Sequence, residues 1–164
     1  MTPKQRMTLA RVGHPEHLDK LVKDKNPKVR TTVAKHGEDK HKDILTKDKD
    51  HKIRYTVAEH GNDKHRDKLI DDKNEYVRAT VAEHGNNSHR DKLVDDEDPW
   101  VRQQVAEYGN DKHRDKLIND PSIFVRTAVA NYGSKEHATK LLDDPHFMVK
   151  NAANGRLYEL SKGN

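Results

Sequence analysis

Histidine recurs through the chain at an interval of 24 residues, and imidazole is both a common metal ligand and a common general base. Six residues share this spacing: His17, His41, His65, His89, His113 and His137. A metal site needs three or four ligands that converge on one point, whereas single histidines one repeat apart form a row that does not converge. We therefore expect packed, hydrogen-bonded histidines, with no metal site and no cofactor.

Arginine recurs at the same interval, and a row of guanidinium groups could bind the phosphates of a nucleic acid. Its members are Arg6, Arg30, Arg54, Arg78, Arg102 and Arg126, followed by Lys150. An aspartate lies six residues before most of them, at Asp24, Asp48, Asp72, Asp96, Asp120 and Asp144. Because charges beside a buried stripe are usually paired, we favour an Asp–Arg ladder over a phosphate-binding row.

A further row of cations contains Lys42, Arg66, Arg90 and Arg114, where the outer copies have Leu18 and Ala138. Long aliphatic stems can pack along apolar surface while their charged heads stay in water. We expect this arrangement here and assign these residues no site.

One more set of equivalent positions changes character along the chain. It contains Lys4, Lys28, Lys52, Tyr76, Trp100, Phe124 and Met148, and the helical period places it on an exposed face. Large exposed aromatic groups in a row are costly unless a partner covers them. Two interpretations stay open: a binding face, or rings that fill the gaps between repeats. Our candidate ligand-binding residues are Tyr55, Tyr76, Trp100, Phe124, Lys28, Lys35 and Lys52.

These residues must be positioned by a unit of 24 residues that is copied about six and a half times. Glycine closes the first half of each copy, at Gly13, Gly37, Gly61, Gly85, Gly109 and Gly133. An N-cap residue opens it, at Thr2, Asn26, Asp50, Asn74, Asp98 and Ser122. The pattern predicts a first helix over about 27–36 that ends at Gly37, a residue typical of helix C-termini, and then a short second helix capped by Asn or Ser.

The predicted fold is an all-α, right-handed α-solenoid in one domain, 1–164. Short helices are marginal alone, so they must be stabilised by stacking on neighbouring copies. The buried stripe contains Val29, Val33 and Ala34 and their equivalents, with Leu45 from the second helix. The repeats span 3–26, 27–50, 51–74, 75–98, 99–122 and 123–146, and a C-terminal cap spans 147–164.

The composition limits the kind of protein. Lys and Arg (32) nearly balance Asp and Glu (28), so the net charge of +4 permits nucleic-acid binding without requiring it. The chain contains no cysteine, which removes disulfides and thiol nucleophiles. No stretch approaches the ~20 apolar residues of a membrane span. We expect a soluble, cytoplasmic protein, monomeric and without membrane contact.

The unit resembles HEAT-type repeats in two overlapping motifs. In the first, five residues separate an aspartate from an arginine, as in Asp96 to Arg102. The second is a Val-Arg pair followed two residues later by a Val-Ala pair, as in Val101 to Ala106. The short length of the unit is more similar to the leucine-rich repeat variant, in which two short helices alternate. The resemblance covers residues 3 to about 153. It implies a superhelical binding scaffold in which such Asp and Arg side chains form a ladder between repeats.

The predicted function is a non-enzymatic recognition scaffold for a protein or peptide segment, bound on the exposed face of the first helices. The alternative is nucleic-acid binding, with bases stacked on the aromatic residues and Lys or Arg on phosphates. Glu59, Glu83 and Glu107 on the same face oppose that alternative. An enzyme is the weakest hypothesis, because no acid, base or nucleophile stands outside the repeat pattern.

Overall fold

The computed structural model describes residues 1–162, which form helices joined by short turns and contain no strand. The first helices of the repeats are α1 (Pro3–Val12), α3 (Pro27–His36), α5 (His51–His60), α7 (Glu75–His84), α9 (Pro99–Tyr108) and α11 (Ile123–Tyr132). The second helices are α2 (Pro15–Leu21), α4 (Asp39–Leu45), α6 (Asp63–Leu69), α8 (Asn87–Leu93), α10 (Asp111–Leu117) and α12 (Lys135–Leu141). A longer helix, α13 (Phe147–Lys162), follows the last repeat. The predicted all-α repeat fold is confirmed.

The helix starts follow the N-cap pattern in the sequence. The side chains of Asn26, Asp50 and Asp98 accept a hydrogen bond from the backbone N–H two residues later, at 2.8–3.0 Å. Pro27 and Pro99 stand at the first helical position, where a backbone N–H would have no partner in the helix. Ser122 is an exception, because its side chain makes no such bond.

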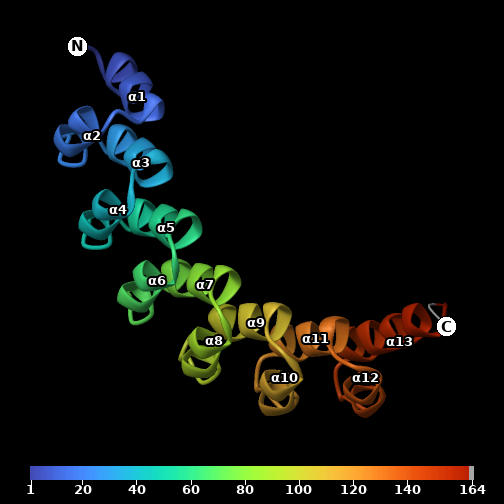
Figure 1. The fold of residues 1–164 in the computed structure, drawn as a ribbon. Coiled ribbons are helices and arrows are strands. Elements are labelled where there is room, and N and C mark those ends of the chain that lie inside the picture. Colours follow the sequence, from blue (N-terminus) through green and yellow to red (C-terminus); the bar gives the residue numbers. More distant parts are fainter. Residues whose placement is uncertain (163–164) are drawn as a thin grey trace. The chain divides into compact units, whose positions relative to one another are not determined.

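The chain divides into two compact units, one spanning Met1–His84 and the other beginning at Gly85. The division falls inside the fourth repeat, between its two helices. Within each unit the first helices form one row, and the second helices lie beside that row (Figure 1). The single domain expected from the unbroken repeat stays a prediction.

The core of each unit is built from small aliphatic side chains. Val29, Val33 and Ala34 of α3 are fully buried, and Leu45 of α4 is almost so. Equivalent valines and alanines of α9 and α11 fill the same role in the second unit. No Phe, Trp or Tyr side chain is part of this core.

The glycines at the ends of the first helices differ in conformation. Gly13 has φ 81° in the left-handed region. At Gly37, Gly61, Gly109 and Gly133 the first helix also ends, but their backbone is extended. Space requires glycine there: a Cβ on Gly61 would lie 2.5 Å from the Val57 carbonyl oxygen and 3.0 Å from the His65 ring.

The last helix begins like a first helix but does not stop where the others do. Leu157 occupies the position at which earlier repeats have glycine, and α13 continues past it to a total length of 16 residues. It packs against both α11 and α12, so it covers the two helices of the last repeat. The predicted cap 147–164 is therefore one helix as far as Lys162, and its final two residues lie outside the described part of the chain.

Candidate functional site

The repeated arginines form a ladder of buried ion pairs. The Nε and Nη2 of Arg30 donate to the two carboxylate oxygens of Asp48 at 2.6 and 3.1 Å, and its Nη1 donates to the carbonyl oxygen of Asp24 at 2.7 Å. The equivalent carboxylate pairs are Arg6–Asp24, Arg54–Asp72, Arg102–Asp120 and Arg126–Asp144.

The carboxylate partner of each of these arginines therefore lies 18 residues after it. Except at Arg6, whose Nη1 donates to the Met1 carbonyl oxygen, the aspartate six residues before contributes its backbone carbonyl instead. Hydrogen bonds that Arg30 donates to Asp48 raise the pKa of Arg30, and those that Arg126 donates to Asp144 lower the pKa of Asp144, against the opposing effect of burial. These groups stay charged and engaged with each other, so they are not available to bind phosphates.

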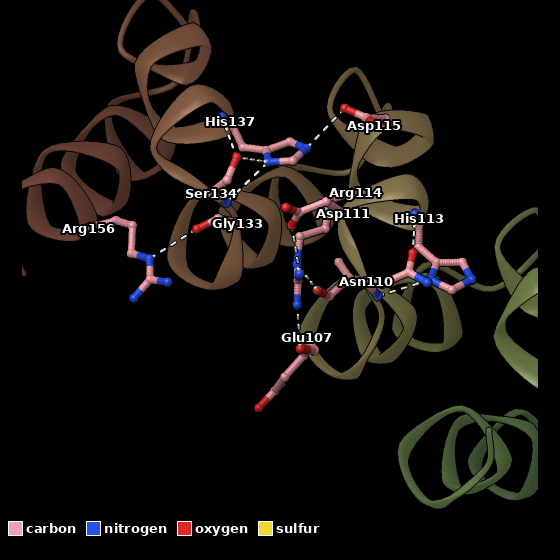
Figure 2. A network of polar contacts seen from close by, with 11 residues as sticks. Glu107, Asn110, Asp111, His113, Arg114, Asp115, Gly133, Ser134, His137 and Arg156 are labelled. Atoms are coloured by element: carbon pink, nitrogen blue, oxygen red, sulfur yellow. Dashed lines mark hydrogen bonds and ion pairs between the residues drawn. The ribbon is translucent and has the colours of Figure 1, made fainter. Parts of the chain in front are cut away.

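The repeated histidines cap the second helices. The backbone N–H of Asn110 donates to Nδ1 of His113 at 3.0 Å, while the His113 N–H donates to Oδ1 of Asn110 at 3.2 Å (Figure 2). Because Nδ1 accepts, the proton of the neutral ring lies on Nε2, where it faces Oδ1 of Asp91 at 3.1 Å. Burial is the main cause that lowers the pKa of His113.

The same arrangement recurs in both units. Ser134 and Asp115 hold His137 in this way, and Nε2 of His41 lies 2.9 Å from Oδ1 of Asp19. The prediction of packed, hydrogen-bonded histidines is confirmed except at the exposed His17. No group of His, Cys, Asp or Glu within residues 1–162 has a geometry that could hold a metal ion.

The aspartates that face these histidines were not predicted from the sequence. Asp19 faces His41, Asp43 faces His65, Asp91 faces His113 and Asp115 faces His137. They belong to a row with a 24-residue spacing that also contains Asp67. The sequence contains a signal for this pairing. The next position of the aspartate row is Thr139, and the next position of the histidine row is Ser161, so the two residue types are lost together. An acceptor that disappears together with its donor indicates a pair.

The prediction that the guanidinium groups of Arg66 and Arg114 lie free in solvent is wrong. Nε of Arg66 donates to the Ala58 carbonyl oxygen at 3.0 Å, and Nε of Arg114 donates to that of Ala106 at 2.9 Å. Each guanidinium thus satisfies carbonyl groups at the end of the preceding first helix, which have no partner within the helix.

In two repeats a different residue donates to the carbonyl groups at the end of the first helix. In the second repeat, Lys42 Nζ donates to the Gly37 carbonyl oxygen at 2.6 Å. In the last repeat Ala138 occupies the arginine position, and Arg156 of α13 donates to Gly133 at 3.1 Å instead (Figure 2). Lys42, Arg66, Arg114 and Arg156 are therefore explained by helix capping.

The exposed face of the first helices carries the candidate ligand-binding residues. In the first unit, Lys28 and Lys35 lie exposed on α3. A shallow pocket of 230 Å³ is lined by His51, Lys52, Tyr55 and Tyr76. The structure thus brings together three candidate residues from α5 and α7. It adds His51, which stands at the position of Pro3, Pro27 and Pro99 in other repeats.

In the second unit the candidate residues are Trp100 and Phe124. Both occupy the second position of their helices, α9 and α11, and they are 45% and 58% exposed. Met148 is the equivalent residue on α13 and is 39% exposed. This position is therefore apolar in the second unit, whereas Lys28 and Lys52 fill it in α3 and α5.

All eight Phe, Trp and Tyr residues of the chain are exposed. They are Tyr55, Tyr76, Trp100, Tyr108, Phe124, Tyr132, Phe147 and Tyr158. Every one lies on a first helix or on α13, and the second helices carry none. Aromatic side chains usually supply much of a protein core, so their distribution here is unusual.

Comparison with known proteins gives a structural relative. The chain is similar to the solved structure of a leucine-rich repeat variant with a novel repetitive structural motif, with 26% identity and a TM-score of 0.55 over 95% of this chain and 77% of the other. A designed armadillo repeat protein is more distant, with 17% identity and a TM-score of 0.34 over 95% of this chain and 90% of that one. No protein-family model matches, and no curated protein matches.

The similarity to a leucine-rich repeat variant confirms the resemblance inferred from the repeat. The chain is a helical repeat scaffold. Within residues 1–162, no helix is both long and apolar enough to cross a membrane.

Proposed function

We propose that the chain is a recognition scaffold that binds an extended or helical segment of another protein on the exposed face of its first helices. The observation that carries this proposal is the exposure of all eight aromatic side chains, six of them on first helices and two on α13. Buried aromatic groups stabilise a fold, whereas exposed ones that gather on one face are typical of interaction sites.

In the first unit, the pocket beside Tyr55 and Tyr76 would receive an apolar side chain of the partner. Lys52 lines the same pocket, and Lys28 and Lys35 lie exposed on α3. These cations favour a partner segment that carries acidic groups beside the apolar anchor. In the second unit, Trp100 and Phe124 would form a separate apolar anchor point.

The proposed function is non-enzymatic. The histidines and arginines that could do chemistry make capping and ion-pair contacts that the fold requires. Nucleic acid is the rival ligand, because an aromatic pocket beside a lysine can also stack a base. Glu59, near the other end of α5 from Lys52, disfavours a phosphate backbone on that face.

A peptide-display library tests the proposal at an ionic strength of about 0.15 M. We expect selected peptides to combine acidic residues with an aromatic or large aliphatic residue. The double variants Tyr55→Ala/Tyr76→Ala and Trp100→Ala/Phe124→Ala should each weaken their peptides by about 30-fold or more, the effect of losing an anchor residue.

Tyr158→Ala is the matched control, because it removes an equally exposed aromatic group outside the candidate residues. If selected peptides bind all variants alike, the proposed face is wrong. Preferential binding of a single-stranded oligonucleotide, with a steep loss of affinity as salt rises, would favour the nucleic-acid alternative.

A further inference from the structure

A second hollow lies away from the aromatic face, between the loops that follow α2 and α4. Its volume is 470 Å³, within the range of small-molecule sites. Four lysines line it: Lys23 and Lys25 from the first loop, and Lys47 and Lys49 from the second. All four side chains are exposed, and none forms an ion pair.

The two aspartates that also line this hollow do not neutralise the lysines. Asp48 accepts from Arg30 at 2.6 and 3.1 Å and from the backbone N–H of Asp50 at 2.9 Å. Asp24 makes the same contacts with Arg6, at 2.6 and 3.2 Å. Each carboxylate is paired with its own guanidinium, so the four ammonium groups leave the hollow with a net positive charge.

The other repeats act as an internal control for this charge. At the position of Lys23 and Lys47 they have Asp71, Asp95, Asn119 and Asp143, and at the position of Lys25 and Lys49 they have Lys73, Glu97, Pro121 and Pro145. The loop therefore folds without the lysines, and stacking of repeats does not explain them.

The positive charge of the chain is concentrated in the same region. Residues 1–50 contain 13 Lys and Arg against 8 Asp and Glu, a net charge of +5, while the remaining residues contain 19 against 20. A nucleic-acid backbone would need cations that continue from repeat to repeat. The paired lysines stop after two loops, which fits a compact anion better than a polymer.

We propose that the hollow lined by Lys23, Lys25, Lys47 and Lys49 binds a compact polyanion that carries two or more phosphate groups. Lysine ammonium groups bind phosphate as point charges without a fixed geometry, and several around one hollow favour a multiply charged ligand. Ile44, which is 47% exposed, gives the hollow an apolar wall against which the body of the ligand can pack.

Calorimetric titration with sodium tripolyphosphate at about 0.15 M ionic strength tests the site directly. The loop variant Lys23→Gln/Lys25→Gln/Lys47→Gln/Lys49→Gln removes the four charges. The control Lys4→Gln/Lys28→Gln/Lys35→Gln/Lys52→Gln removes four exposed charges from the first-helix face of the same unit. Circular dichroism and the thermal midpoint verify that both variants fold, and the single variant Lys47→Gln gives a milder change.

We expect the loop variant to weaken tripolyphosphate binding by more than about tenfold, at two- to fivefold per lysine, and the control to weaken it by less than about threefold. Equal losses in the two variants would show general attraction to a basic unit and overturn the proposal. Absence of tripolyphosphate binding by the unaltered chain would also overturn it.

Two further ligands identify the source of the phosphate groups. Vesicles of phosphatidylcholine doped with phosphatidylinositol bisphosphate test a lipid headgroup, and binding to them that requires the four loop lysines supports the same site. A single-stranded oligonucleotide tests nucleic acid. Suppose that the oligonucleotide displaces tripolyphosphate and that both variants lose oligonucleotide binding equally. The ligand would then be a polymer bound along the unit, and the proposal of a compact polyanion would be overturned.

Discussion

The polar residues around the second helices and the exposed residues of the first helices follow opposite rules. Around the second helices, the same aspartate, histidine and arginine recur, and each contacts a partner within the fold. On the first helices, the exposed position changes from Lys28 and Lys52 to Trp100 and Phe124. Repetition of a polar group here means that stacking needs it. Variation at a fixed exposed position means that stacking does not determine it.

The strongest test of the first rule is the Arg102–Asp120 pair, whose side chains are 14% and 4% exposed. Either Arg102→Ala or Asp120→Ala should lower the free energy of unfolding by about 2–4 kcal/mol, because each leaves a buried charge without its partner. The double variant should cost less than the sum of the two. Chemical denaturation measures all three.

The exposed pair Lys140–Glu136 on α12 is the control for that cycle. Glu136→Ala should leave the unfolding midpoint unchanged within error, because solvent screens the pair. If Asp120→Ala were equally harmless, the arginine ladder would not stabilise the repeats.

The close approach at the end of the first helix predicts the next largest effect. Gly61→Ala should destabilise the chain by about 1–3 kcal/mol, since the new methyl group would press on the Val57 carbonyl and the His65 ring. Gly155→Ala is the opposite case, because that glycine lies in α13 with open space around its Cα. It should stabilise the chain by up to about 1 kcal/mol. Thermal unfolding of both variants distinguishes a crowded glycine from a free one.

The histidine caps predict a loss of stability in mild acid. The pKa of His113 is lower in the folded chain than the ordinary value near 6.5, so the unfolded chain takes up the proton first. Stability is therefore fully present above about pH 6.5 and declines as the pH falls through the folded pKa. Nitrogen NMR of the ring should show the proton on Nε2 at neutral pH. A proton on Nδ1 would contradict the cap geometry.

The smallest expected effect on stability is at the variable face. Trp100→Ala should cost about 1 kcal/mol or less, because nearly half of the side chain is already exposed. The emission of this sole tryptophan should indicate partial exposure in the free protein and shift to the blue when a selected peptide binds. A buried emission spectrum, together with a large loss of stability, would make the ring a packing residue.

The repeat made much of the fold predictable. Six copies in register identify the buried Val33, the N-cap Asp98 and the bounds of α3 without ambiguity, because chance patterns do not recur six times. The arginine partner could not be found this way. In a period of 24, an aspartate six residues before Arg30 and one 18 residues after it belong to the same row, so only geometry distinguishes Asp24 from Asp48.

Other features depended on distances that a sequence does not contain. Gly61 is required by the nearby His65 ring rather than by a left-handed backbone, and both causes leave the same letter in the sequence. The head of Arg114 reaches carbonyl groups of the preceding helix, which a helical wheel cannot show. For the candidate site, the pattern placed Tyr55, Tyr76 and Lys52 on one face, but their common pocket and His51 needed the structure.

The arginine ladder also bears on how such a chain can change its length over generations. Arg30 reaches forward to an aspartate and back to a carbonyl, both at fixed offsets, so each repeat carries one unmet donor and one unmet acceptor at its borders. An in-frame duplication or deletion of 24 codons would join a donor to an equivalent acceptor at the new junction. The number of repeats can then change without leaving a buried charge unpaired. Duplication or deletion would lengthen or shorten the array while every remaining arginine keeps its aspartate and its carbonyl partner.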